Sequence, residues 1–277
     1  MLQWRATALL LTCWIVAISP AAARDSTWLP VDWQSPHYID HRLVGQVFDG
    51  SGDPTSPARV IQQAQQSRFV LLGEAHDNPD HHRVQAALVD ILTSGSRRAA
   101  VVFEQVPQRL AAEVAQYDLK SDPQLDDFGL RLEWESRGWY EWNIYRPIAL
   151  AAANNGSRMI AGNLDQSLTR AISKSGLAAL TSAQISAFGL ETKLPQAAAR
   201  DLNLELQDSH CGMMPKSALP AMTNVQRARD GSMAQAMIQA ADPHGSILIA
   251  GTGHVRKDRG VPYVLHQLLH KGSTATA

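Results

Sequence analysis

The sequence predicts an α/β fold, in which a parallel sheet is covered by helices on both faces and carries an inserted, smaller all-helical subdomain. Short, continuously apolar runs recur along the chain, and segments with helical periodicity separate them. Strands that are apolar throughout are typical of a sheet buried on both faces. With 277 residues, 45% of them hydrophobic, the chain can form a sizeable core.

Four apolar runs are expected to form the strands. They are RFVLLGE at 68–74, AAVVFE at 99–104, SRMIAGN at 157–163 and GSILIAGTGH at 245–254. A helix should follow the first run, because Asn78 is a good N-cap and Pro79 suits the first helical position. Gly95 is expected to end that helix. Further helix starts are predicted at Thr181 and near Ser217.

Two segments do not fit this alternation and predict the domain organisation. Residues 108–145 and 167–242 contain no convincing strand, and we expect them to form the helical subdomain. The α/β domain would then comprise 24–107, 146–166 and 243–277.

The first 23 residues have the pattern of a secretory signal peptide. Arg5 precedes the apolar run ATALLLTCWIVAIS, and Ala21 and Ala23 offer a cleavage site, so cleavage is expected after Ala23. This predicts an exported protein in the periplasm or associated with the outer membrane. A second interpretation stays open: Cys13 follows LLT, a weak lipobox that would provide a lipid anchor.

Charge and cysteine content exclude other classes. The 25 basic and 26 acidic residues are nearly balanced and form no basic stripe, so no nucleic-acid partner is expected. Cleavage would leave Cys211 as the single cysteine, which excludes an intramolecular disulfide.

Each predicted strand delivers a polar side chain to its carboxyl end, where open α/β sheets bind their ligands. Glu74 ends the first run and His76 follows it, Glu104 ends the second, and His254 ends the fourth. Imidazole and carboxylate groups are ligands for divalent metals and are also the usual general acids and bases. These four residues are therefore the candidate catalytic and metal-binding set. His81 and His82 are interpreted as the solvated first turn of the next helix.

Several motifs resemble the ChaN family of haem-binding uptake lipoproteins, within the Tiki and erythromycin-esterase-like superfamily. The most specific are LLGEAHDNPDHHRVQ and AGTGHVRKDRGVPYVL; VVFEQVP, RGWYEWNIYRPI, HCGMMP and VQRARDGSMAQAM lie between them in the family's order. The resemblance covers about residues 40–270. It implies a larger parallel α/β domain, a smaller helical domain, haem binding for iron acquisition, and haem held between two protomers.

The resemblance also bears on the site residues. It implies that Glu74, His76, Glu104 and His254 occupy positions used by the superfamily's hydrolase branches. The chain departs from the family in its weak lipobox and in reading FEQVP where LEMF is common. The first departure puts lipid anchoring in doubt, and the second changes the neighbours of Glu104.

Haem needs an axial His, Met, Cys or Tyr ligand. The sequence DSHCGMMP offers His210, ranked first, followed by Cys211 and Met213. In the aromatic stretch WESRGWYEWNIYRP, Tyr145 could line a haem pocket and Arg146 could pair with a propionate. Packing of these residues in a helical core is the alternative explanation.

Three functions follow from these observations. The first is an exported haem-binding protein of haem and iron uptake, with haem, a second copy of the chain and envelope uptake components as its partners. The second is a metal-dependent ester or amide hydrolase that uses the four strand-end residues. The third is a non-catalytic envelope protein that has kept the fold.

Overall fold

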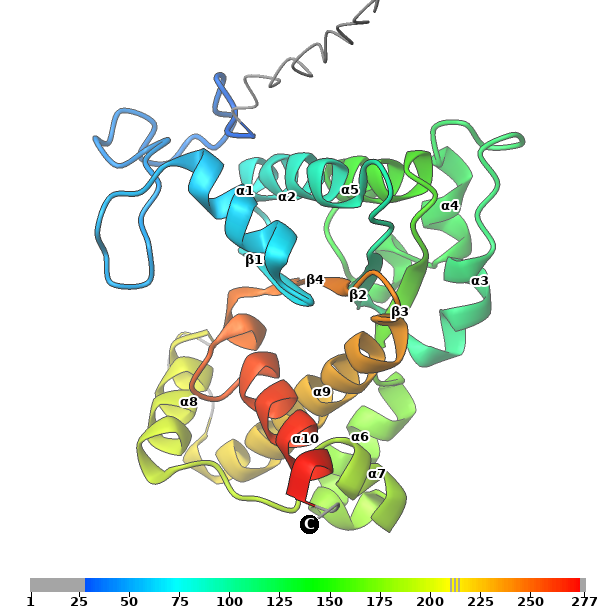
Figure 1. Cartoon of the computed structure of the whole chain (residues 1–277). Helices are drawn as coiled ribbons and strands as arrows, with labels where there is room; N and C mark the ends of the chain where they lie inside the picture. The colour runs from blue at the N-terminus through cyan, green and yellow to red at the C-terminus, as the bar shows by residue number, and fades with distance from the viewer. Residues whose placement is uncertain (1–27, 210, 212, 214, 275–277) are drawn as a thin grey trace, which may run out of the picture.

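The computed structural model describes residues 28–209, 211, 213 and 215–274 and has a parallel sheet between two helical layers (Figure 1). The strands are β1 (Phe69–Glu74), β2 (Ala100–Pro107), β3 (Met159–Asn163) and β4 (Ser246–Gly251). They lie in the order β1-β4-β2-β3, and every neighbouring pair is parallel. Three strands lie within the predicted runs, and β2 begins in its run and continues beyond it to Pro107. The predicted α/β class is confirmed.

The central strands explain the apolar runs. Every residue of β2 and β4 is buried, because each strand has a neighbour on both sides and a helical layer on both faces. The edge strands β1 and β3 are only partly buried. Continuous apolarity therefore reflects burial on both faces.

One face of the sheet is covered by α1 (Pro57–Gln66), α2 (Pro79–Thr93) and α5 (Trp142–Asn154), with α3 (Ala111–Ala115) and α4 (Asp126–Arg131) beside them (Figure 1). Phe103 and Ile249 share this core with Trp134 and Ile148. The Asn78 side chain caps α2 as predicted, by accepting hydrogen bonds from the first turn of the helix.

The other face carries α9 (Leu219–Ala240) and α10 (Val261–Thr274). Met233 and Met237 pack there against Val102 and Leu248, so these methionines belong to the core. Farther from the sheet lie α6 (Gln166–Ser175), α7 (Ser182–Ala187) and α8 (Gln196–Ser209) (Figure 1). Short 3₁₀ helices complete the elements: η1 (Gln108–Leu110), η2 (Glu135–Arg137), η3 (Gly176–Ala179), η4 (Lys216–Ala218) and η5 (Thr252–Val255).

The helical segments share cores with the sheet. Phe128 and Trp134, from segment 108–145, pack into the same cluster as β2, while α9 covers the opposite face. A separate cluster around Ile172 joins α6 to α9. The predicted domain boundaries stay a prediction, and the predicted signal peptide at 1–23 lies outside the described residues. Within the described part of the chain, no helix is long and apolar enough to span a bilayer.

Strand order determines what meets at the carboxyl edge. Because β4 lies between β1 and β2, the turn after β4 is placed between the ends of the other two strands. Residues that are about 150 positions apart in sequence therefore become neighbours.

Candidate functional site

The predicted strand-end residues do come together. Glu74 ends β1, Glu104 lies in β2, and His254 lies in η5, directly after β4; all three are buried. His76 follows β1, and its side chain is 34% exposed. The arrangement forms two hydrogen-bonded networks, one around each carboxylate.

The first network surrounds Glu74. Its Oε1 accepts hydrogen bonds from the Tyr145 hydroxyl at 2.8 Å and from Gln105 Nε2 at 2.9 Å, and it lies 2.8 Å from His76 Nδ1. Burial alone would raise the pKa of Glu74, but the hydrogen bonds from His76 and Tyr145 and the charge of His82 outweigh it and lower the pKa to about 2. Glu74 is therefore a stable carboxylate inside the protein.

His82 belongs to this network, so its predicted solvated position is wrong. It is fully buried, with Nδ1 3.1 Å from Gln85 Oε1 and Nε2 3.1 Å from the His76 carbonyl oxygen. Burial lowers the pKa of His82, but the negative charge of Glu74 outweighs burial and raises the pKa above its ordinary value. Glu74 Oε2 lies 3.3 Å from His82 Nδ1. This contact is an ion pair and not a hydrogen bond, because His82 Nδ1 donates to Gln85. Glu74 Oε2 has no hydrogen-bond partner among the described residues.

His81, in contrast, is exposed, and the prediction for it is confirmed. Its Nδ1 accepts a hydrogen bond from the Ala75 N–H at 2.9 Å. The two adjacent histidines differ because His82 packs against the buried Glu74 and Gln85, whereas His81 lies at the surface.

The second network surrounds Glu104. Its Oε1 lies 2.5 Å from Arg229 Nη2 and 3.3 Å from His254 Nε2, and its Oε2 accepts the Gly251 N–H at 2.7 Å. His254 Nδ1 lies 2.6 Å from Asp230 Oδ1. The imidazole of His254 is therefore held between two carboxylates.

Charge balance controls the second network. Burial raises the pKa of Glu104, but His254 and Arg229 outweigh it and hold the pKa well below its usual range. Burial lowers the pKa of His254, and the charges of Glu104 and Asp230 reverse this and raise it to about 9. Burial raises the pKa of Asp230 despite the opposing charge of His254. Near pH 7 the network therefore contains a buried imidazolium.

The two networks meet at Gly251. A Cβ atom on this residue would lie 2.9 Å from both Cε1 and Nε2 of His76, and 3.6 Å from Glu104 Oε2. Only glycine allows this close approach without displacing the imidazole. His76 also makes an edge contact with Trp139, with ring centroids 5.2 Å apart.

The predicted divalent-metal centre is not supported. Among the described residues, no three His, Cys, Asp or Glu side chains are placed to hold a metal ion. Glu104 is bonded to Arg229 and the Gly251 N–H, and Glu74 to Tyr145 and Gln105. Protein donors therefore satisfy both oxygens of Glu104 and the Oε1 of Glu74. The catalytic role of Glu74, His76, Glu104 and His254 stays a prediction.

The predicted haem-binding residues are dispersed. Tyr145 is fully buried, and its hydroxyl donates to Glu74. Arg146 pairs with Asp126 of α4. Cys211 is exposed, and Met213 is 82% exposed. His210 lies outside the described residues, so its role, like that of the other four, stays a prediction.

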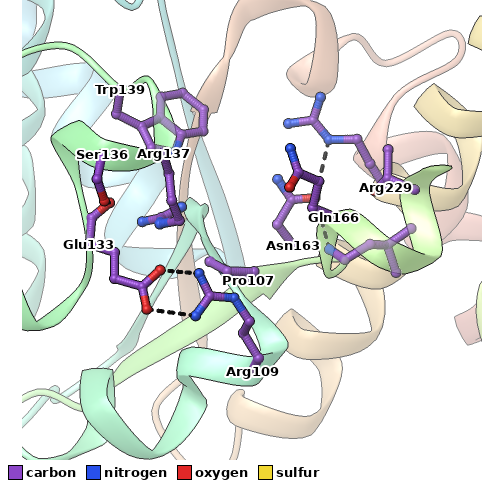
Figure 2. A pocket seen from close by; sticks show the side chains of 11 residues that line it. Pro107, Arg109, Glu133, Ser136, Arg137, Trp139, Asn163, Gln166 and Arg229 are labelled. Atoms are coloured by element: carbon purple, nitrogen blue, oxygen red, sulfur yellow. Dashed lines mark hydrogen bonds and ion pairs between the residues drawn. The ribbon is translucent and has the colours of Figure 1, made fainter.

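A pocket of about 610 Å³ opens beside the first network, at the carboxyl ends of β2 and β3 (Figure 2). Trp139 is one wall of the pocket and is also the ring neighbour of His76. Arg109 pairs with Glu133, and Arg229 Nε donates to Asn163 Oδ1 at 3.1 Å. The lining residues are Pro107, Arg109, Glu133, Ser136, Arg137, Trp139, Asn163, Leu164, Gln166, Thr169 and Arg229.

A different kind of surface lies in residues 28–56, ahead of α1. An open hollow of about 430 Å³ is lined by Tyr38, His41, Leu43 and Val44. The apolar side chains exposed in this segment are Val31, Tyr38, Ile39, Leu43 and Phe48. We call this surface the N-terminal hollow.

Comparison with known proteins now places the chain. Residues 60–265 match the sequence model of the family described as haem-binding uptake, Tiki superfamily, ChaN. The chain belongs to the ChaN family. The family is one of haem-binding proteins, which the resemblance predicted.

Individual relatives are more distant. ChaN of Campylobacter jejuni, whose structure was solved as a case of cofacial haem binding, superposes with a TM-score of 0.62 at 20% identity, over 79% of this chain and 84% of that chain. This likeness to ChaN confirms the fold. The chloroplastic protein RETICULATA-RELATED 5 of Arabidopsis thaliana is 24% identical over 84% of this chain, which spans 35% of that protein's length.

Sequence reasoning missed several partners of the site. Gln105, Arg229 and Asp230 were not singled out, and Tyr145 was assigned only to haem. A signal was present for two of them: Arg229 and Asp230 precede Met233 by four and three positions, which places them on the sheet-facing side of α9. The N-terminal hollow had a weaker signal, the sequence HYIDH at 37–41.

Proposed function

We propose that the chain is an exported haem-binding protein of haem and iron uptake at the bacterial cell envelope. The observation that carries the proposal is the family match over residues 60–265. We further propose that haem binds in the N-terminal hollow with Tyr38 as its axial ligand. Because the matched segment begins after the hollow, this placement rests on the chemistry of the surface.

Three properties of the N-terminal hollow support haem there. Tyr38 is 83% exposed, and a tyrosine oxygen is an established haem-iron ligand. The apolar side chains of Ile39 and Leu43 beside it suit the porphyrin ring. The backbone of Tyr38 has φ +59°, an uncommon conformation for a residue with a side chain, and such outliers cluster at ligand sites.

The backbone around Tyr38 is ordered by a turn. The His41 N–H donates to the Tyr38 carbonyl oxygen at 2.8 Å, and the Val44 N–H donates to the His41 carbonyl oxygen at 2.9 Å. These bonds hold Tyr38 and His41 on the same small surface, with His41 as the second candidate ligand. The pocket beside His76 is less suitable, because none of its lining residues is His, Met, Cys or Tyr.

The openness of the hollow favours a pair of protomers. A haem on an exposed surface keeps one face uncovered, and a second copy of the chain carrying its own haem would cover it. Cofacial haem binding is described for the relative from Campylobacter jejuni. We therefore propose a haem-dependent homodimer.

Hemin titration of the protein expressed without residues 1–23 tests the haem proposal. We expect a Soret band that shifts and saturates, and a Tyr38→Phe variant that loses the ligand signature and binds more weakly. Tyr140→Phe, at a tyrosine that is 51% exposed, is the matched control and should titrate like wild type. Absence of a saturable band would refute haem binding, and an unchanged Tyr38→Phe spectrum would refute the placement. His41→Ala, Cys211→Ala and Met213→Ala then test the other described candidates.

Export has its own experiment. Mass spectrometry of the native protein from fractionated cells should give a chain that begins at Arg24 in the periplasmic fraction. A mature N-terminus at a lipidated Cys13 would replace the soluble periplasmic form with an outer-membrane anchor. An uncleaved chain in the cytoplasm would refute export.

A further inference from the structure

Arg137 lines the 610 Å³ pocket and forms no ion pair with a carboxylate among the described residues; its guanidinium lies 6.0 Å from the centroid of the Trp134 ring. Its Nε donates to the Leu132 carbonyl oxygen at 3.0 Å, and its Nη1 donates to the Gln105 carbonyl oxygen at 2.6 Å. Both acceptors are neutral. Its Nη2 is buried and has no hydrogen-bond partner among the described residues. Buried donors in folded proteins almost always have an acceptor, so the protein leaves the Arg137 guanidinium incompletely compensated.

The other two arginines of the pocket are already compensated. Arg109 pairs with the carboxylate of Glu133, and Arg229 pairs with the buried carboxylate of Glu104. Figure 2 shows the Arg109–Glu133 pair below Arg137, with Arg229 across the view. Burial, together with the neighbouring charge of Arg109, lowers the pKa of Arg137 to about 10. The lining of the pocket therefore has an excess positive charge centred on Arg137.

The remaining lining indicates the class of ligand. Ser136, Asn163, Gln166 and Thr169 supply neutral polar groups, and Trp139 supplies one aromatic wall. The volume is in the range of small-molecule sites. Because no lining residue is a haem-iron ligand, the pocket suits a hydrophilic compound.

We propose that this pocket binds a small organic anion, with its carboxylate or phosphate group on Arg137 and its body against Trp139. The anion compensates the positive charge of Arg137, whose side chain lines the pocket, in a charge-assisted interaction. Trp139 also touches the ring of His76, so the bound compound lies next to the Glu74–His76 pair. The site is separate from the N-terminal hollow and does not depend on haem.

Calorimetric titration with inorganic phosphate and with malonate, in a low-salt chloride buffer, tests the proposal. We expect saturable binding of at least one probe, and the probe that binds more tightly identifies the anionic group. Ser136→Glu is the informative variant, because it places a carboxylate in the pocket and leaves the Arg137 side chain in place. We expect it to weaken binding by about tenfold or more.

Ser136→Gln is the matched control, since it has nearly the same size without the charge. It should bind within about twofold of wild type, because the hydrogen bonds of Arg137 are preserved. Failure of both probes to saturate on wild-type protein would overturn the proposal, and so would equal weakening by Gln and Glu. Unfolding curves of both variants establish that they are folded.

Hemin titration of Ser136→Glu distinguishes the two proposed sites. We expect its hemin affinity to equal that of wild type. A hemin affinity that falls together with the phosphate or malonate affinity would mean that the pocket receives a haem propionate, which would overturn a separate ligand. A protein that binds no hemin but still binds the anion would refute only the haem proposal.

Discussion

The carboxyl edge of the sheet and the N-terminal hollow contain the same kinds of side chain in opposite environments. At the sheet edge, Glu74 and Tyr145 are buried and bonded to each other. In the hollow, Tyr38 is 83% exposed and lies among exposed apolar residues. The difference teaches that a concentration of ionisable residues does not by itself identify the ligand surface. The buried networks join distant strands, whereas the side chains of the hollow are exposed, and it is there that we propose haem binding.

Removing a charge from the sheet edge should have the largest effect. Glu104→Gln leaves the buried His254 imidazolium and the partly exposed Arg229 guanidinium without their shared carboxylate. We expect a loss of about 3–5 kcal/mol in the free energy of unfolding, measured by urea denaturation. Glu133→Gln, which breaks a half-exposed pair with Arg109, is the control and should change stability little. Equal losses in the two variants would contradict the structural role of the buried network.

Tyr145→Phe should have a smaller effect. It removes one hydrogen bond to the buried Glu74 carboxylate and keeps the aromatic ring in the core. We expect a loss of about 1.5–3 kcal/mol in unfolding free energy, the usual contribution of a hydrogen bond to a charged group. Tyr140→Phe, at an exposed position, provides the comparison and should unfold like wild type. A stable Tyr145→Phe protein with altered hemin binding would instead assign Tyr145 to the ligand.

The pH dependence of stability is a third test of the sheet edge. The pKa of His254 is raised from 6.5 to about 9, so its contribution is complete below pH 6.5 and is lost as the pH rises through 9. The pKa of Glu74 is lowered from 4.5 to about 2, so its contribution is complete above pH 4.5 and is lost as the pH falls through 2. Thermal unfolding between pH 6.5 and 9 should show falling stability.

His254→Gln is the control for the alkaline slope. It removes the buried imidazolium, so the variant should be less stable at neutral pH and should lose much less stability between pH 6.5 and 9. A slope as steep as that of wild type would assign the dependence to other groups.

The sequence predicted the parts of the site that depend on neighbours along the chain. The strand runs, the Asn78 cap and the arrival of Glu74, Glu104 and His254 at one edge follow from local patterns and from the geometry of parallel sheets. The partners of these residues do not follow. Tyr145 is 71 positions from Glu74. Their contact requires that α5 packs on the sheet face toward which the Glu74 side chain points.

A local sequence pattern also could not predict which polar residues of a helix are buried. His81 and His82 are adjacent polar residues in the first turn of α2, yet one is exposed and the other is fully buried. His82 is buried because it contacts Glu74 at the end of β1 and Gln85 of the same helix. The hollow was missed for the opposite reason, because an exposed surface without helical or strand periodicity leaves little signal in the sequence.

Hemin titration of Tyr38→Phe and Tyr145→Phe, side by side with wild type, tests the central claim most directly. The account predicts that Tyr38→Phe loses the axial-ligand signature in the Soret and visible bands and binds hemin more weakly. Tyr145→Phe should give the wild-type spectrum, because the Tyr145 hydroxyl donates its hydrogen bond to Glu74. A wild-type spectrum for Tyr38→Phe together with a lost signature for Tyr145→Phe would contradict the account and place haem at the sheet edge.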